Sequence, residues 1–220
     1  MLDNLDLSHL PREKQELAFI LAEELQQRET RKLARDDFLT FVRTMWPSFI
    51  EGAHHRKMSQ TFNRIARGEL KRVIINMGPR HSKSEMSSYM LPSWLLGLKP
   101  DLKIIQATHT GELAVRFGRK IRDLVDTEEY KRIFENVALR ADSKAAGRWE
   151  TSKGGEYFAA GVGGAITGRG ADVLIIDDPH SEQDAMSETA MESAYEWYTS
   201  GPRQRLQPGG TIVLVMTRWS

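Results

Sequence analysis

Two residues at the junction of a strand and a helix could bind a phosphate group. Lys83 and Ser84 follow a β-branched run and stand where a helical stretch begins. Loop amides and a helix N-terminus attract an anion, a lysine reaches the outer phosphates of a nucleotide, and a hydroxyl coordinates magnesium. The sequence therefore predicts that Lys83 binds the phosphates of ATP and that Ser84 binds Mg²⁺.

The predicted phosphate-binding loop departs from the usual glycine pattern. That pattern places glycines six and one positions before the lysine, where this chain has Met77 and Ser82. Gly78 lies one place late and could supply the sharp turn. Arg80 adds a cation inside the loop, and its alternative role is a surface charge. We expect the nucleotide to contact all seven residues of the loop, which are Gly78, Pro79, Arg80, His81, Ser82, Lys83 and Ser84.

An apolar strand from residue 172 to 177 ends in two carboxylates. Ligands of open α/β sheets bind at this C-terminal edge, and strand alternation turns Asp177 and Asp178 in different directions. We predict that Asp177 binds Mg²⁺ and that Asp178 orients or activates the attacking water. Many ATP-hydrolysing motors have Glu at the second position. The alternative for Asp178, which precedes Pro179, is a helix N-cap.

The elements around these residues alternate between strand and helix. Apolar spacing predicts helices at about 11–33, 37–45 and 55–66, then strands at 72–76, 103–108, 156–160, 172–177 and 211–216. One helical stretch begins at residue 85, and two further helices are predicted at 112–125 and 187–206. Near-continuous apolar strands with intervening helices predict a parallel sheet covered on both faces. We expect an α/β three-layer nucleotide-binding core at 67–220, preceded by a helical N-terminal arm at 1–66.

The composition excludes several classes of protein. The chain has 220 residues, a net charge of +1, and no cysteine. A disulfide scaffold, a cysteine-ligated metal site and thiol chemistry are thereby excluded. No apolar run reaches the roughly 18 residues that span a bilayer, and the acidic N-terminus does not resemble a signal peptide. We expect a cytosolic protein that does not interact with membranes.

Three linked motifs resemble a known family. Residues 78–85, 163–179 and 208–219, in this order and spacing, resemble the large terminase subunit of tailed bacteriophages. The resemblance covers roughly residues 37–220. It implies a P-loop ATPase of the ASCE type, assembled as a homo-oligomeric ring on the capsid portal, that drives double-stranded viral DNA into a preformed capsid. It further implies the portal protein and the small terminase subunit as partners, in the cytoplasm of the infected bacterial host.

The resemblance also implies roles for single residues. It places Lys83 and Ser84 in the phosphate loop, with the two acids as magnesium and catalytic residues. Thr217 matches the coupling position at the end of the next strand. Arg169 matches the candidate arginine finger that acts on the ATP of a neighbouring subunit. Its alternative is a loop arginine that binds carbonyl groups, and Arg140 and Arg148 are competing candidates for the finger.

The segment before the first strand is where relatives of this family bind adenine. Trp46 and His55 are the predicted contacts here, and Gln60 is a nearby glutamine. Trp46 could instead pack the arm onto the core. His54 and His55 are metal ligands by type, but no histidine or acid lies at a suitable spacing, so helix-cap or nucleotide-edge contacts are favoured.

The family continues into a lid subdomain and a nuclease domain, which we expect to be absent from this chain. No unassigned cluster of acids remains for two-metal DNA cleavage. Two other functions stay open, a helicase-like motor and a nucleotide-binding module that docks on a portal without hydrolysis. A basic run could contact DNA or be a solvated helix face, and it comprises Arg116, Arg119, Lys120 and Arg122.

Overall fold

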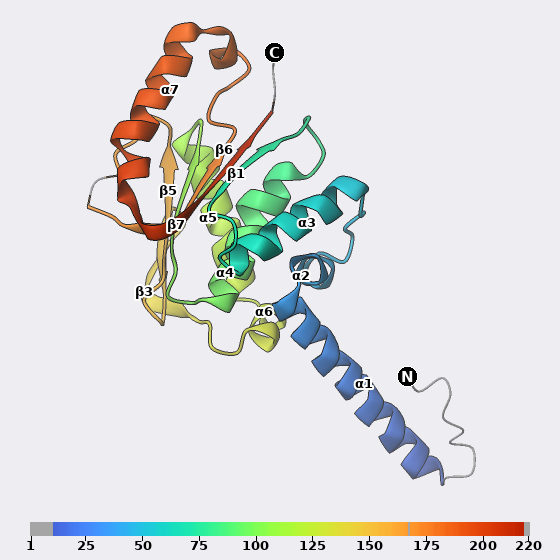
Figure 1. Cartoon of the computed structure of the whole chain (residues 1–220). Coiled ribbons are helices and arrows are strands. Elements are labelled where there is room, and N and C mark those ends of the chain that lie inside the picture. The colour runs from blue at the N-terminus through green and yellow to red at the C-terminus, as the bar shows by residue number, and fades with distance from the viewer. Residues whose placement is uncertain (1–10, 167, 218–220) are drawn as a thin grey trace.

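The core of the molecule is a seven-stranded sheet with the strand order β1-β7-β6-β2-β5-β4-β3 (Figure 1). The computed structural model describes residues 11–166 and 168–217. Five strands pair in parallel, namely β1 (Arg72–Asn76), β7 (Leu206–Met216), β6 (Ala171–Asp177), β2 (Lys103–Thr108) and β5 (Glu156–Gly161). The antiparallel strands β4 (Arg148–Thr151) and β3 (Leu139–Ala145) extend the sheet beyond β5. The predicted mainly parallel α/β sheet is confirmed.

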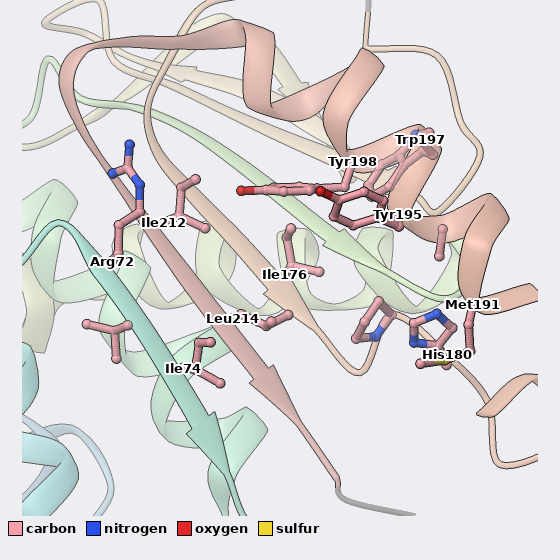
Figure 2. Close-up of a pocket in the computed structure, with 13 residues that line it drawn as sticks. Arg72, Ile74, Ile176, His180, Met191, Tyr195, Trp197, Tyr198, Ile212 and Leu214 are labelled. Carbon is pink, nitrogen blue, oxygen red and sulfur yellow. The ribbon is translucent and has the colours of Figure 1, made fainter. Parts of the chain in front are cut away.

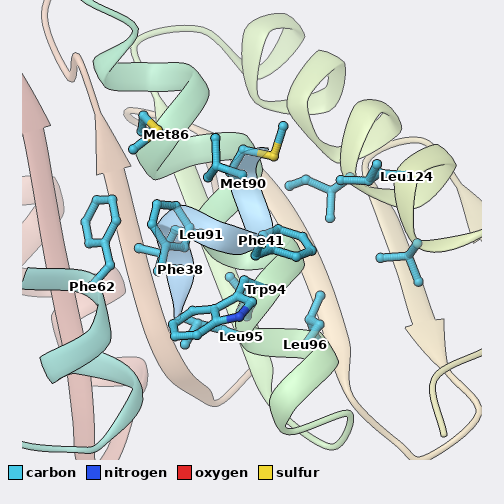
Figure 3. Close-up of a cluster of buried hydrophobic side chains, with 14 of the residues drawn as sticks. Phe38, Phe41, Phe62, Met86, Met90, Leu91, Trp94, Leu95, Leu96 and Leu124 are labelled. Atoms are coloured by element: carbon cyan, nitrogen blue, oxygen red, sulfur yellow. The ribbon is translucent and has the colours of Figure 1, made fainter. Parts of the chain in front are cut away.

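Most helices lie on one face of this sheet. Five helices of the described chain pack in that layer, namely α2 (Phe38–Met45), α3 (Ala53–Ala66), α4 (Leu91–Leu98), α5 (Gly111–Val125) and α6 (Glu128–Ile133). Helix α1 (Arg12–Asp36) joins the layer at its C-terminal end, where Ala34 is buried. A π-helical turn, η2 (Glu85–Met90), leads into α4. Phe38, Phe41, Phe62 and Trp94 meet in the large apolar core between these helices and the sheet (Figure 3).

The opposite face has a thinner cover. In the described part of the chain, α7 (Glu188–Ser200) is the α-helix that packs there, through Trp197 and Tyr198, against Ile105, Leu174 and other strand residues. Short 3₁₀ turns, η3 (Asp184–Met186) and η4 (Pro202–Arg205), flank α7. The two layers of helices are therefore unequal, which leaves part of the strands β1, β7 and β6 accessible.

Helices α2 and α3 share the core of the sheet domain. Phe38 lies 5.0 Å from Phe62 and 5.5 Å from Trp94 between ring centroids, so α2 packs on α4 and α3 packs on α2. The Trp94 indole donates to the carbonyl oxygen of Ala34 at the end of α1. The division of the chain at residue 66 into separate domains stays a prediction.

The sequence missed some elements and overextended one. All five strands predicted from the sequence are present, whereas α6 and the hairpin β3–β4 were not predicted. The helix predicted over 187–206 ends at Ser200, because Gly201 leaves helical geometry and Pro202 has no N–H to continue it. The predicted terminase-like motif at 208–219 continues through Arg218 and Trp219, which lie outside the described residues.

No helix in the two described stretches combines the length and apolar character needed to cross a membrane.

Asp37 links the first three helices. Its carboxylate accepts from the Thr40 amide at 2.8 Å and from Asn63 Nδ2 at 2.8 Å, and Asn63 Oδ1 accepts from the Phe38 amide at 2.9 Å. Burial alone would raise the pKa of Asp37, but the hydrogen bonds from Asn63 and Thr40 outweigh it and lower the pKa from its usual 3.8.

Replacing Asp37 with alanine should destabilise the fold by about 1–2 kcal/mol, because α2 loses its N-cap and Asn63 loses its partner. The lowered pKa means that this contribution is complete above pH ~4 and is lost as the pH falls further. Urea unfolding at neutral pH and at pH ~3 measures both effects. Asp36→Ala, at the exposed end of α1, is the control and should change the unfolding free energy by less than about 0.5 kcal/mol. Equal losses in the two variants would contradict the capping role.

Candidate active site

The loop between β1 and η2 is held in an unusual backbone conformation. Arg80 and Ser82 have φ angles of 61° and 58°, in the left-handed region that glycine favours. Ser82 occupies the position where the usual phosphate-loop pattern has glycine, so it adopts a glycine-like conformation with a serine side chain. Such a residue costs about 1–2 kcal/mol and persists only where neighbours hold it.

Lys83 and Asp178 meet across the C-terminal edge of the sheet. Lys83 is buried and its Nζ lies 2.6 Å from Asp178 Oδ2. Lys83 follows β1, whereas Asp178 follows β6, and β7 separates these two strands. The structure thus joins the two groups that the sequence predicted would act on the phosphates and on the water.

Asp178 is fixed by both its backbone and its side chain. Its φ of 41° turns the chain away from β6, its amide donates to the Val215 carbonyl oxygen at 2.8 Å, and its carbonyl oxygen accepts from the His109 amide. The second carboxylate oxygen, Oδ1, accepts from the Thr217 amide at 2.7 Å. Thr217 is therefore next to Asp178, as its predicted coupling position requires, while its role stays a prediction.

Asp177 is held by two serines from the helical segment after the loop. Ser84 Oγ donates to Asp177 Oδ1 at 3.1 Å, and Ser88 Oγ donates to Oδ2 at 2.7 Å. The two serines are four residues apart and share a helix face. Their segment is π-helical, with the Leu91 amide bonded to the Met86 carbonyl oxygen, directly before Pro92, which has no N–H. Ser88 was not predicted, although its spacing from Ser84 was the available signal.

Burial raises the pKa of Asp177 to about 6, although the hydrogen bonds from Ser88 and Ser84 lower it. The Ser84 hydroxyl and the Asp177 carboxylate are adjacent hard oxygen ligands of the kind magnesium takes. No group of three or more His, Asp or Glu suited to a metal ion occurs in the described stretches. The pair therefore fits a magnesium ion that takes its remaining ligands from phosphates and water, and it does not form a complete protein cage.

His55 connects α3 to the loop. The Gly52 amide donates to His55 Nδ1 at 2.9 Å, so Nδ1 is unprotonated, and Nε2 carries the proton that it donates to the His81 carbonyl oxygen at 3.3 Å. Burial and then the neighbouring His54 lower the pKa of His55, which favours this neutral form. Both ring nitrogens are thus occupied. A nucleotide contact through either nitrogen, as the sequence predicted, would require one of these bonds to break.

Aromatic packing continues from His55 back to the end of α2. The rings of His55 and Phe49 lie 4.7 Å apart, and Phe49 lies 5.2 Å from Trp46. The Trp46 indole donates to Ser48 Oγ at 3.0 Å. This arrangement gives Trp46 the packing role that was its alternative, and its predicted contact with adenine stays a prediction.

The predicted arginine finger lies at the other end of the sheet. Arg169 precedes β6, bonds Glu156 at the start of β5, and stacks 4.3 Å above the Phe158 ring. The strand β6 begins two residues after Arg169 and its seven residues extend roughly 20 Å to Asp177, at about 3.3 Å per residue. Arg169 therefore does not reach the site of its own chain. Its competitors, Arg140 and Arg148, are also paired with acids of the β3–β5 region.

Two cations of the basic run on α5 have other tasks. Lys120 Nζ lies 2.6 Å from Glu85 and 4.3 Å from the centre of the Tyr89 ring, and Arg122 pairs with Asp123. Arg116 and Arg119 are exposed and have no ion pair within the described part of the chain. Contact with DNA stays a prediction.

Comparisons with known proteins find a similarity in structure and none in sequence. No family model and no curated protein match the chain. The chain is similar in structure to the large terminase of bacteriophage HK97. That similarity has a TM-score of 0.47 at 11% sequence identity and covers 76% of this chain. The chain spans about a third (33%) of the HK97 terminase chain. A likeness at this level leaves the chemistry to be inferred from the residues of the site.

Replacing Ser88 with alanine should destabilise the protein by about 1.5–3 kcal/mol, because a buried carboxylate loses a hydrogen bond. The matched control is Ser93→Ala. Ser93 is equally buried, lies in the same helical segment and donates to the neutral carbonyl oxygen of Tyr89. The control should lose about 1 kcal/mol, and urea unfolding at pH 7 compares the two. A larger loss in the control would mean that the Ser88–Asp177 bond contributes little.

Replacing His55 with leucine should destabilise the fold by about 2 kcal/mol or more, since the Gly52 amide and the His81 carbonyl lose their partner. The lowered pKa of His55 also means that wild-type stability falls as the pH drops below 6.5, where the unfolded chain takes up the proton more readily. The variant should lack that component.

Unfolding curves at pH 7.5 and 5.5 measure this difference. His54→Leu is the control, because it leaves both bonds in place and changes a ring that also faces His81. It removes only the second cause of the lowered pKa of His55 and leaves burial, the first, so it should keep most of the pH dependence; Glu51 is the acid near the pair and is unchanged in both variants. An unchanged pH dependence in His55→Leu would show that His55 does not contribute to it.

Proposed function

We propose that the chain is the ATP-hydrolysing motor domain of a viral terminase large subunit, with a P-loop core of the ASCE type. The observation that carries the proposal is the joining of the loop after β1 to the acidic end of β6, through Lys83 with Asp178 and Ser84 with Asp177. A cation, a hydroxyl and two carboxylates at the C-terminal edge of a parallel sheet are what binding and hydrolysis of Mg·ATP require.

The phosphates would be bound by the loop. The Lys83 side chain is buried, so water screens its charge little. It would neutralise the outer phosphates. The amides of residues 78–84 and the start of η2 would surround the remaining oxygens. Because His55 fixes the loop at the His81 carbonyl, the entropy lost when the loop binds the nucleotide is reduced.

The two acids would divide the remaining work. Magnesium, when bound between Ser84 and Asp177, would neutralise charge that develops on the phosphate oxygens. Asp178 would accept a proton from the attacking water or orient it, since its carboxylate is held between Lys83 and the Thr217 amide. Movement of Lys83 towards the phosphates would free Oδ2 for that water, which connects nucleotide binding with activation of the base.

Coupling and assembly complete the proposal. Thr217 would sense the γ-phosphate through Asp178 and pass the change to β7. Arg169 would act on the ATP of a neighbouring subunit, since it lies at the opposite end of β6 in its own chain. The proposed partners are double-stranded viral DNA, the portal protein, the small terminase subunit and further copies of the chain. The proposed place of action is the bacterial cytoplasm at the capsid portal.

One feature favours a second candidate function, nucleotide binding without hydrolysis. Both oxygens of Asp178 are already bonded, one to Lys83 and one to the Thr217 amide. If these bonds persisted with nucleotide bound, no carboxylate oxygen would be available for a water. The protein would then change shape with its nucleotide and would not turn it over.

Variants of the two central groups test the proposal. Lys83→Ala should weaken Mg·ATP binding at least ~100-fold, because the buried cation that neutralises the phosphates is lost. Asp178→Asn should bind Mg·ATP as the parent does and lose hydrolysis at least ~100-fold, because an amide cannot accept the proton. Calorimetry measures the binding, and phosphate release measures the turnover.

Lys71→Ala is the control for a lysine on the same strand segment but at its other end, and it should behave as the parent. Unchanged affinity in Lys83→Ala would refute the phosphate site. A parent protein that binds Mg·ATP but releases no phosphate, alone or with DNA, would favour the non-hydrolysing candidate.

A further inference from the structure

An apolar groove of about 410 Å³ opens on the thinly covered face of the sheet. Strands β1, β7 and β6 form its floor with Ile74, Leu214 and Ile176, and α7 forms its wall with Met191 and Tyr195 (Figure 2). Ile74 and Tyr195 are 67% and 60% exposed. Large apolar side chains exposed together in a concave surface are typical of a protein-binding site.

A second unpartnered apolar surface lies on α1. This 25-residue helix projects from the body of the molecule (Figure 1), and Ala34 near its C-terminal end is its one buried residue. Leu17, Leu21 and Leu25 are 55%, 50% and 64% exposed. Their spacing of four places them along one side of the helix, where they form a leucine stripe.

The groove and the leucine stripe of one chain cannot meet. Ala34 anchors α1 in the core on one face of the sheet, and Trp94 and Arg35 bond this end of the helix there. Ile176 and Ile212 of the groove belong to the core on the opposite face. The sheet therefore lies between the two surfaces, and α1 points away from α7 (Figure 1).

We propose that the leucine stripe of one copy docks into the groove of a second copy. The dimensions agree, since Leu17 to Leu25 spans roughly 12 Å along the helix and the three strands of the floor span about 10 Å. The leucine stripe would cover the exposed Ile74, Met191 and Tyr195, which removes apolar area from water on both partners.

The charges around the two surfaces are complementary. Lys14 and Lys32 lie on the same side of α1 as the leucine stripe, one beyond each end, and neither has an ion pair in the described parts of the chain. The exposed acids of α7 form a row at spacings of four next to Tyr195 and likewise lack ion pairs there, namely Glu188, Glu192 and Glu196. Opposite charges of this kind fix orientation and speed association more than they add affinity.

The contact is heterologous, because the surface that docks and the surface that receives differ. Each copy then keeps one free leucine stripe and one free groove, so further copies can add head to tail. The groove ends at Pro179 and His180, directly after Asp178. Docking therefore brings the arm of one copy beside the chain segment that follows the proposed catalytic acid of another.

Cysteine cross-linking tests the docking directly, since the natural chain has no cysteine. Chains carrying Leu21→Cys are mixed with chains carrying Met191→Cys and oxidised at several concentrations, without nucleotide. A disulfide between the two kinds of chain, formed at least ~10-fold faster than with the control Phe19→Cys, supports the proposal. Phe19 is 60% exposed and lies two residues from Leu21, so it points to nearly the opposite side of α1.

Other outcomes overturn it. Rapid disulfides between two Leu21→Cys chains would show that α1 pairs with α1, and cross-linking no faster than the control would show that the groove binds no α1. Sedimentation of chains without added cysteines compares two variants with the parent. Leu21→Glu should weaken self-association ~10-fold or more, and Phe19→Glu should leave it unchanged. A chain that is monomeric at all concentrations would also contradict the proposal. None of these readouts depends on ATP binding, so they succeed or fail separately from the proposed activity.

Discussion

The ion pair between Lys83 and Asp178 can form only because three parallel strands are aligned with one another. β1 delivers the lysine, β6 delivers the aspartate, and β7 lies between them and supplies the Thr217 amide that holds the other carboxylate oxygen. In a parallel pair all C-terminal ends lie at one edge, so groups that are 95 residues apart in the chain come within 2.6 Å. A slip of one residue in either pairing would turn these side chains to the wrong face.

The loop that carries Lys83 is strained, and its neighbours supply the compensation. The left-handed Arg80 and Ser82 are unfavourable by themselves. They are held from one side by His55 through the His81 carbonyl oxygen and from the other by Ser84 and Ser88 through the buried Asp177. The hydrogen bonds to Asp177 act in a poorly hydrated site, where an unpaired carboxylate would be costly. The same hydrogen bonds thus stabilise the loop and satisfy the buried Asp177 carboxylate.

The sequence predicted the parts of this site that follow from the order of elements. A strand followed by Lys83, and another followed by Asp177 and Asp178, define an edge without knowledge of any contact. The role of Ser88 depends on the π-helical register before Pro92, which its spacing of four from Ser84 does not determine by itself. The role of His55 depends on how α3 packs beside the loop, which no local pattern shows. The antiparallel strands β3 and β4 were missed because they contain several charged residues and no run of apolar residues. Arg169 was assigned from the resemblance to the terminase family, and in the structure it bonds an acid and stacks on an aromatic ring at the far edge of the sheet.

The unequal cover of the two sheet faces links the fold to assembly. On one face a layer of helices, α2 to α6 in the described chain, buries the strands, and the site forms where the loop and η2 join that layer. On the other face α7 leaves apolar strand surface exposed in the described chain, and exposed apolar area of this kind is unfavourable in water. The same chain has a projecting helix, α1, with the exposed leucine stripe. In the described chain both surfaces face water, whereas head-to-tail copies would bury both with one contact per subunit. Since the groove adjoins the segment after Asp178, such a contact would place assembly and the proposed chemistry at the same edge of the sheet.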